Sequence, residues 1–264
     1  MNVTKTDVVI DKSFLQGAPK DSLECLFNTH RVLMLQGNFY ELLTTTNQHQ
    51  CFKRIPALAN PVARVEGKGT ILRWEINNQR PLLNIDPVII QGSFTFNPGL
   101  INENFKINED QTRHLEDWAR EVKDNVRNFV ILGSQVPVRF PELTDYRPGN
   151  DARKIEEIKK RICTDKEFVR ELYNDGRKYT WPSAEQIDER WAIFKWRQIK
   201  YLAALDYYRK YGEIEMSSNT PKIENEYLDL EYCLVGCIAG AIATHDNGMK
   251  KRFLAICPTG KVIS

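Results

Sequence analysis

The sequence contains no long hydrophobic run. The longest apolar segment, CLVGCIAGAIA at residues 233–243, has 11 residues. A helix needs about 20 apolar residues to cross a bilayer. The opening segment MNVTKTDVVIDKSFL holds only a short apolar stretch before a charged aspartate, so it does not resemble a signal peptide. These features predict a cytoplasmic protein without a membrane partner.

Neither sign of charge dominates the chain. The 37 lysines and arginines against 35 aspartates and glutamates give a net charge of +2. Such a balance neither requires nor excludes a nucleic-acid partner, because a local patch matters more than the total charge. The apolar fraction of 42% is sufficient for a packed core. A chain of 264 residues then favours one large domain, or a core domain with an insertion.

Several common site motifs are also missing. The six cysteines include no CxxC pair, so a structural zinc site is not expected. No HExxH, GxxxxGK[ST] or GxGxxG occurs, which excludes zinc proteases of that type and the common nucleotide-binding loops. The DxDxT signature of aspartyl-phosphate hydrolases needs an acid where Ser13 stands. A catalytic cysteine or serine remains open, although no local signature supports one.

The N-terminal part alternates between strand and helix patterns. Residues 8–10 and 32–35 are short β-branched or apolar runs typical of buried strands. Residues 19–29 carry apolar side chains on one helical face, and Asn38 offers an N-cap for a helix over 39–43. Strand, helix, strand, helix at this spacing predicts a βαβ unit with a parallel sheet.

The rest of the chain divides into a helical middle and a C-terminal return to the first pattern. Residues 56–102 are rich in proline, asparagine and glycine and are interpreted as irregular. Helices are predicted over 109–132, 152–163, 166–175, 183–211 and 222–242, followed by a turn at 245–248, a short helix, a candidate strand at 254–257 and a closing segment at 261–263. We therefore expect an α/β core built from residues 1–55 and 222–264, with a mostly helical insertion over 56–221.

Four acidic residues occupy positions where catalytic or metal-binding residues are often found. Asp11 ends the first strand, Glu41 lies just inside the helix after the second, Asp229 interrupts an apolar helix, and Asp246 follows the small-residue segment AIATH. In a parallel sheet the carboxyl ends of the strands form the crevice where ligands bind. Clustered carboxylates repel, so they need a cation or raised pKa values, and oxygen ligands select Mg²⁺ or Mn²⁺. This chemistry suits phosphodiester hydrolysis.

Each of these carboxylates also has a purely structural interpretation. Asp11 would cap the segment after its strand, Asp246 would be a turn residue, and Glu41 would be a solvated acid on a helix face. Asp229 is harder to explain this way, because both of its neighbours are leucines and it is expected beside a buried face. Glu226, one helical turn earlier, is an outer candidate for supporting the site. The four carboxylates together favour a site.

The pattern resembles the PIN-domain family of metal-dependent ribonucleases. VVIDKSFL is similar to that family's first strand with its metal-binding aspartate, and VLMLQGNFYELL to its second strand and following helix. YLDLEYCLVGCIAGAIATHDNGM is similar to its last two motifs, an aspartate on a helix and then a T-x-D turn. The resemblance implies a three-layer Rossmann-like core and a Mg²⁺ or Mn²⁺ site formed by Asp11, Glu41, Asp229 and Asp246, with Thr244 supporting it by hydrogen bonding. It covers residues 7–55 and 222–263, whereas the insertion is foreign to the compact members.

The segment at 188–212 is the most aromatic part of the chain. Trp191, Phe194 and Tyr201 share one helical face, with basic residues such as Arg190 and Arg197 interleaved. Rings stack on bases and cations meet phosphates, so RNA contact is one interpretation. The other interpretation, which is favoured, is that these aromatic residues belong to the hydrophobic core, since an aromatic stripe on a helix usually packs against the protein interior. In a combined interpretation the apolar face packs on the core and Arg190 or Arg197 leans toward the carboxylates.

The sequence thus leads to two hypotheses of function. The first is a Mg²⁺- or Mn²⁺-dependent endonuclease that cuts RNA, with DNA as a second candidate substrate. The other is a catalytically inactive PIN-like scaffold that binds a partner protein or RNA through the helical insertion.

Overall fold

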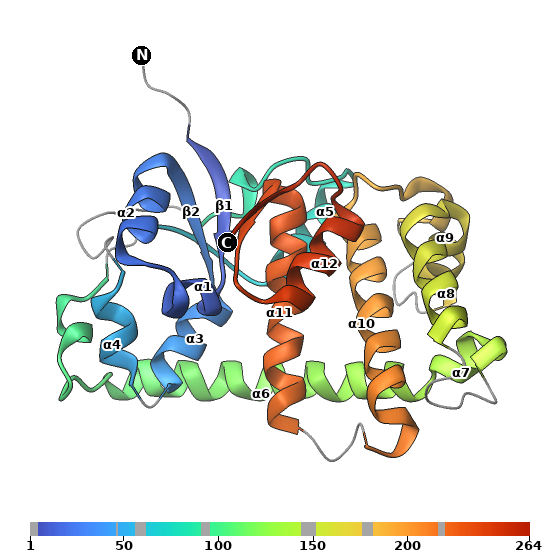
Figure 1. Cartoon of the computed structure of the whole chain (residues 1–264). Helices are drawn as coiled ribbons and strands as arrows, with labels where there is room; N and C mark the ends of the chain where they lie inside the picture. The colour runs from blue at the N-terminus through green and yellow to red at the C-terminus, as the bar shows by residue number, and fades with distance from the viewer. Residues whose placement is uncertain are drawn as a thin grey trace.

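A small, all-parallel sheet lies at one end of the molecule. The computed structural model describes residues 5–45, 47–55, 62–90, 96–143, 152–175, 182–215 and 220–264. The strands are β1 (Thr6–Ile10), β2 (His30–Leu35), β3 (Ala63–Val65), β4 (Ala241–Ala243) and β5 (Lys261–Ile263), in the spatial order β3-β2-β1-β4-β5 (Figure 1). The predicted parallel sheet, and with it the α/β class, is confirmed.

The two faces of this sheet are both covered by helices. Val8 and Ile10 of β1 pack on one face with α1 (Lys12–Gly17) and α2 (Lys20–Thr29), and α3 (Gln36–Thr44) and α4 (Gln48–Lys53) extend this cluster. Val9, between them, points to the opposite face, where it joins a core that includes α11 (Thr220–Ala239). Alternation of side chains along a strand explains this division. A strand that is buried on both faces is continuously apolar, as the run Val8–Ile10 is.

Glycines allow α11 to lie directly against the sheet. A Cβ on Gly236 would stand 2.2 Å from the side chain of Ile242 on β4, so only glycine fits there. Gly240 has a φ of 81° and reverses the chain from α11 into β4. Left-handed backbone is open to glycine at little steric cost. The small residues at 233–243 therefore allow α11 to pack closely on β4 and the chain to turn tightly between them.

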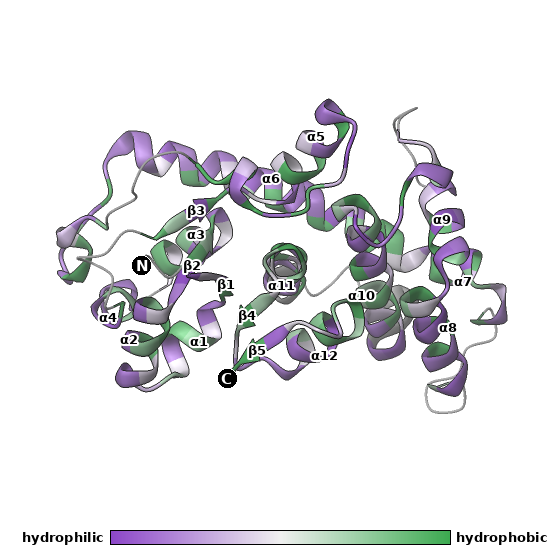
Figure 2. Ribbon diagram, turned by 90° about the horizontal axis from the view of Figure 1, so that it is seen from above, coloured by the Kyte–Doolittle hydropathy of each residue, from purple (hydrophilic) through white to green (hydrophobic). Residues whose placement is uncertain are grey.

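The helices of the predicted insertion, called the helical block below, extend the hydrophobic core that covers one face of the sheet. Its long helices are α6 (Glu109–Ser134), α8 (Ala152–Thr164), α9 (Lys166–Asp175) and α10 (Ala192–Glu215), with the short α7 (Val136–Arg139) between them. α12 (Asn247–Ile256) connects β4 to β5. Figure 2 shows α11 between the sheet and α10, with α8 and α9 on the far side. Buried residues of the strands, α6, α8 and α10 form one continuous cluster. Among the described helices, none is both long enough and apolar enough to cross a membrane.

The aromatic stripe of the helical block is part of this interior. Trp191 is 5% exposed, Phe194 is 3% exposed and Tyr201 is 1% exposed. Tyr201 packs edge-on against Phe140, with ring centroids 5.9 Å apart. The core-packing interpretation of these aromatic residues is confirmed, so the rings are not available for stacking on bases.

Some sequence-based boundaries were wrong. Residues 56–102, interpreted as irregular, contain β3 and an 11-residue helix, α5 (Lys68–Asn78), as well as 3₁₀ turns at Asp86–Val88 and Pro98–Ile101; residues 56–61 and 91–95 lie outside the described part. β3 has three residues, too few to show alternation. Because it pairs with β2, the sheet extends past the predicted core boundary at residue 55.

Three further elements differ from their predicted form. The candidate strand at 254–257 belongs almost wholly to the end of α12, where Leu254 is exposed. The capping box at Ser183 closes a separate 3₁₀ turn, Ala184–Gln186, and α10 begins only at Ala192. Asn38 is the third residue of α3 instead of its N-cap, and its Oδ1 accepts a hydrogen bond from the Leu35 N–H at 2.9 Å.

A buried carboxylate joins α5 to the start of α10. Glu75 is 1% exposed, and its carboxylate accepts hydrogen bonds from the backbone N–H groups of Leu82 (2.9 Å), Ala192 (2.8 Å) and Ile193 (3.0 Å). Ala192 and Ile193 are the first residues of α10, whose N–H groups have no partner within the helix. Burial raises the pKa of Glu75, while these three hydrogen bonds oppose the shift.

Removing this carboxylate should destabilise the whole chain. We expect Glu75→Ala to lower the free energy of unfolding by about 3 kcal/mol, because three buried N–H groups lose their acceptor. Urea denaturation followed by circular dichroism measures the change. Glu103→Ala is the matched control, since Glu103 is exposed. Equal stabilities for the two variants would show that the buried carboxylate does not hold α10 in place.

Candidate active site

Asp11 is held at the carboxyl end of β1 by two hydroxyl groups. It is 5% exposed. Its Oδ2 accepts a hydrogen bond from Thr244 Oγ1 at 2.7 Å and another from the Ser13 hydroxyl. Thr244 Oγ1 in turn accepts from the Asp246 N–H at 3.0 Å. The supporting hydrogen bond expected of Thr244 is therefore present, and it ties the end of β1 to the segment after β4.

Glu41 approaches the same edge from α3. Its carboxylate accepts a hydrogen bond from the hydroxyl group of Tyr232 on α11. Burial raises the pKa of Glu41 to about 7, and the negative charge of Asp11 adds to the increase, whereas the Tyr232 hydrogen bond and the positive charge of Lys12 oppose it. A carboxyl group with such a pKa exchanges protons near neutral pH.

Asp229 lies on α11, three residues before Tyr232 and hence on the same side of that helix. Burial raises its pKa well above the usual value. The charges of Asp11, Glu41 and Asp246 raise it further, and Arg252 on α12 opposes them. The four predicted carboxylates thus interact at Asp229, where the charges of the three other acids raise the pKa and Arg252 opposes them with a smaller effect.

Asp246 has a structural role as well. It is exposed, and its Oδ1 accepts a hydrogen bond from the Met249 N–H at 2.6 Å, which caps the N-terminus of α12. This agrees with its interpretation as a turn residue. Its charge nevertheless acts on Asp229. The same side chain therefore both begins α12 and contributes to the acidic cluster.

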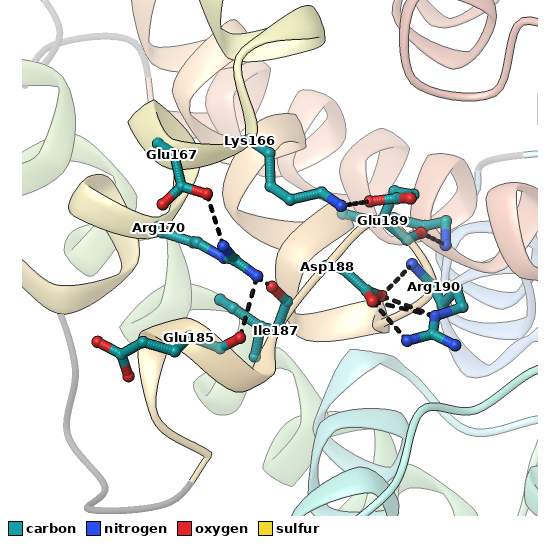
Figure 3. Close-up of polar contacts among 9 residues, drawn as sticks. Lys166, Glu167, Arg170, Glu185, Ile187, Asp188, Glu189 and Arg190 are labelled. Carbon is teal, nitrogen blue, oxygen red and sulfur yellow. Dashed lines mark hydrogen bonds and ion pairs between the residues drawn. The ribbon is translucent and has the colours of Figure 1, made fainter.

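The structure does not place the other predicted residues at the carboxylates. Glu226 lies on α11 and, among the described contacts, makes no hydrogen bond to any of the four acids. Arg190 is bound by Asp188 through two nitrogens, at 3.0 and 2.6 Å (Figure 3). Arg197 lies over the Tyr173 ring of α9, 5.5 Å from its centroid. Their assignment to nucleic-acid binding stays a prediction.

Hydrogen bonds and ion pairs hold the segment that carries Arg190. Figure 3 shows the segment before α10 held by side chains of α9, with Arg170 donating to the carbonyl groups of Ile187 and Glu185 at 3.0 Å each. Lys166 pairs with Glu189 at 2.8 Å. Within this segment, the guanidinium of Arg190 is bound by its neighbour Asp188.

The sequence analysis missed four contributors to the site. Ser13 and Tyr232 donate hydrogen bonds to the carboxylates, and Lys12 and Arg252 supply positive charge. The position of Tyr232 one helical turn after Asp229 was a usable signal. Lys12 and Arg252 carried no signal, because only the fold brings α1 and α12 to the acids.

The chemistry of the acidic cluster fits a hard divalent cation. It consists of oxygen donors, and two of its members, Glu41 and Asp229, have pKa values that are raised by burial and by neighbouring negative charge. Within the described residues, no three Asp, Glu, His or Cys side chains form a group arranged to hold a metal ion. Mg²⁺ commonly keeps several waters and binds through only one or two carboxylates, so a closed protein shell is not required.

An aromatic pocket lies beside α3, the helix that carries Glu41. Its volume is about 540 Å³, and its walls include Phe39, Tyr40 and Trp118. The Tyr40 and Trp118 rings lie 4.5 Å apart at an angle of 49°. Arg64 also lines the pocket, and its Nε is buried without a hydrogen-bond partner. Pockets of this size accept small organic ligands or single nucleotides.

Comparison of the chain with protein-family models, with curated proteins and with solved structures finds no match. The site is therefore interpreted from its own geometry and charge.

Proposed function

We propose that the chain is a Mg²⁺- or Mn²⁺-dependent endonuclease that cuts RNA at the carboxyl edge of its sheet. The main support is the effect of the other acids on Asp229, whose pKa is raised by burial and by the nearby charges of Asp11, Glu41 and Asp246. A cluster of carboxylates that lacks enough compensating charge is suited to a divalent cation.

In this proposal each side chain has a definite task. Of Asp11, Glu41, Asp229 and Asp246, one or two would bind the metal directly and the others through its waters; when bound, the metal would activate water and neutralise charge on the leaving oxygen. Thr244 and Ser13 both donate to Oδ2 of Asp11, which orients Oδ1 for the cation. Tyr232 orients Glu41 in the same way through its hydroxyl group. In the metal-free chain the pKa of Glu41, about 7, reflects a buried negative charge that a bound cation would offset.

The surroundings of the site favour a single-stranded polynucleotide. The aromatic pocket presents the partly exposed rings of Phe39, Tyr40 and Trp118 beside α3. Bases that are not paired stack on such rings with little dependence on sequence. Among polynucleotides, RNA is proposed on the resemblance to the PIN-domain family, with single-stranded DNA as the competing substrate.

A cleavage assay on labelled strands tests the proposal. The wild-type chain is incubated with single-stranded RNA or single-stranded DNA in Mn²⁺, in Mg²⁺ or in EDTA. We expect metal-dependent cleavage of RNA, slower cleavage of DNA and none in EDTA, because the acids cannot bind a phosphodiester without a cation. Cleavage that persists in EDTA contradicts the metal-dependent site. A folded protein that cuts nothing and shows no Mn²⁺-dependent rise in melting temperature supports the non-catalytic scaffold instead.

A further inference from the structure

A second pocket lies between α8, α10 and α12, on the side of α12 away from the sheet. Its volume is about 580 Å³. The charged side chains that line it are Glu156, Lys159, Lys160, Asp206, Arg209, Lys251 and Arg252. None of these residues belongs to the acidic cluster, although Arg252 is the cation whose charge opposes the raised pKa of Asp229.

The pocket has an excess of positive charge. Five cationic side chains face two carboxylates, which leaves three positive charges without a counter-charge in the pocket. Both carboxylates are already shared: Glu156 accepts from Lys159 and from Arg209 at 3.1 Å each, and Asp206 accepts from Lys159 at 2.6 Å. Within the described residues, no carboxylate pairs with Lys160 or Lys251, and both of these lysines are exposed. The excess therefore faces the open volume.

Arg252 gives an independent indication of a missing acceptor. Its side chain is 12% exposed, and the nearest carboxylate oxygen, on Asp206, lies 3.8 Å away. Its Nε is buried and has no hydrogen-bond partner. Buried donors are rarely left unpaired, because the loss of their hydration is not recovered. Arg252 also lines the pocket, where an anion would add to the weak pairing that its guanidinium makes with Asp206.

We propose that this pocket binds clustered phosphate groups. Phosphate offers several acceptor oxygens and a high charge, and it pairs with the planar guanidinium of Arg252 and with the point charges of Lys160 and Lys251. Binding of this kind requires neither the metal nor cleavage, so it goes beyond the function proposed above. The phosphates come either from a polynucleotide backbone or from a small polyphosphate ligand.

The position of the pocket connects it to the carboxylates. Gly248 lines the pocket and lies two residues after Asp246, which caps the same helix. Arg252, the sixth residue of α12, faces Asp206 of the pocket and also acts on Asp229. A strand whose phosphates occupy the pocket would therefore continue over the N-terminus of α12 toward the acids.

Binding without metal tests the proposal. The affinities of the full chain for tripolyphosphate and for a fluorescent single-stranded RNA are measured in EDTA by calorimetry and by fluorescence anisotropy. The test variant is Lys160→Ala/Lys251→Ala. The control is Lys53→Ala/Lys123→Ala, which removes the same charge from two exposed lysines outside the pocket. Both variants are checked for the wild-type melting temperature.

We expect the pocket variant to lose about tenfold in affinity or more relative to the control, since each lysine contributes a charged hydrogen bond. If the ligand is RNA, the slope of log affinity against log salt should also decrease by about 1.4. Loss for tripolyphosphate alone identifies a small polyphosphate ligand, and loss for RNA identifies the backbone. Equal affinities of the two variants for both ligands overturn the proposal. Because EDTA prevents metal-dependent cleavage, this result is independent of the cleavage assay.

Discussion

Asp11→Asn is expected to lower the rate of metal-dependent RNA cleavage by about a thousandfold or more. Asp11 is buried at the end of β1, and its ionised carboxylate would hold the cation through Oδ1. Asparagine keeps an oxygen that can still accept the Thr244 hydrogen bond, so the local structure should survive. The amide has no negative charge, so the cation loses a ligand that the other acids cannot replace.

The control for this substitution is Asp21→Asn, on the exposed side of α2. The same amide change there should leave the cleavage rate within about twofold of wild type. Circular dichroism and melting curves establish that both variants are folded. Wild-type cleavage by a folded Asp11→Asn chain would remove Asp11 from the site and with it the proposed metal centre.

Glu41→Gln is expected to stabilise the metal-free chain at pH 8 by about 3 kcal/mol. Burial raises the pKa of Glu41 from 4.5 to about 7, so between these values the folded state binds more protons than the unfolded state. The contribution of Glu41 to stability is therefore fully present below pH 4.5 and is lost as the pH rises to about 7. Glutamine carries no charge at any pH, and its carbonyl oxygen still accepts from Tyr232.

Urea denaturation in EDTA across pH 4 to 8 measures this dependence. The difference in stability between Glu41→Gln and wild type should grow from pH 4.5 to pH 7 and then level off. Glu24→Gln, on the exposed part of α2, should follow the wild-type curve at every pH. A constant difference between Glu41→Gln and wild type would show that Glu41 titrates normally in the folded chain.

Long elements with regular periodicity could be predicted from the sequence, as could the apolar runs of β1 and β2, whereas the shortest strand, β3, could not. Helices α6, α8, α9 and α11 were found within a few residues, because each carries an apolar face over several turns. β3 was missed because three residues cannot show a period. α12 was divided into a helix and a strand, since its last turn, with Leu254 and Ile256, is apolar and resembles a strand over so short a length.

For the candidate site, too, some residues could be predicted from the sequence and others could not. Parallel strands place their carboxyl ends at one edge, so Asp11 and Asp246 could be brought together from topology alone. The hydroxyl group of Tyr232 and the charges of Lys12 and Arg252 depend on the packing of α1, α11 and α12, which local patterns do not encode. Arg190 was predicted to contact RNA because aromatic and basic residues surround it in the sequence. In the structure, its position is fixed by the ion pair with Asp188.

The order of the strands delays assembly of the site during protein synthesis. Among the described strands, β1 is synthesised shortly before its neighbour β2, whereas its other neighbour, β4, follows more than 200 residues later. Asp11 and Thr244, which share a hydrogen bond, are 233 positions apart. A nascent chain shorter than this has neither Thr244 nor Asp246. If the acids cut RNA, a nascent chain therefore cannot do so until translation has passed residue 246.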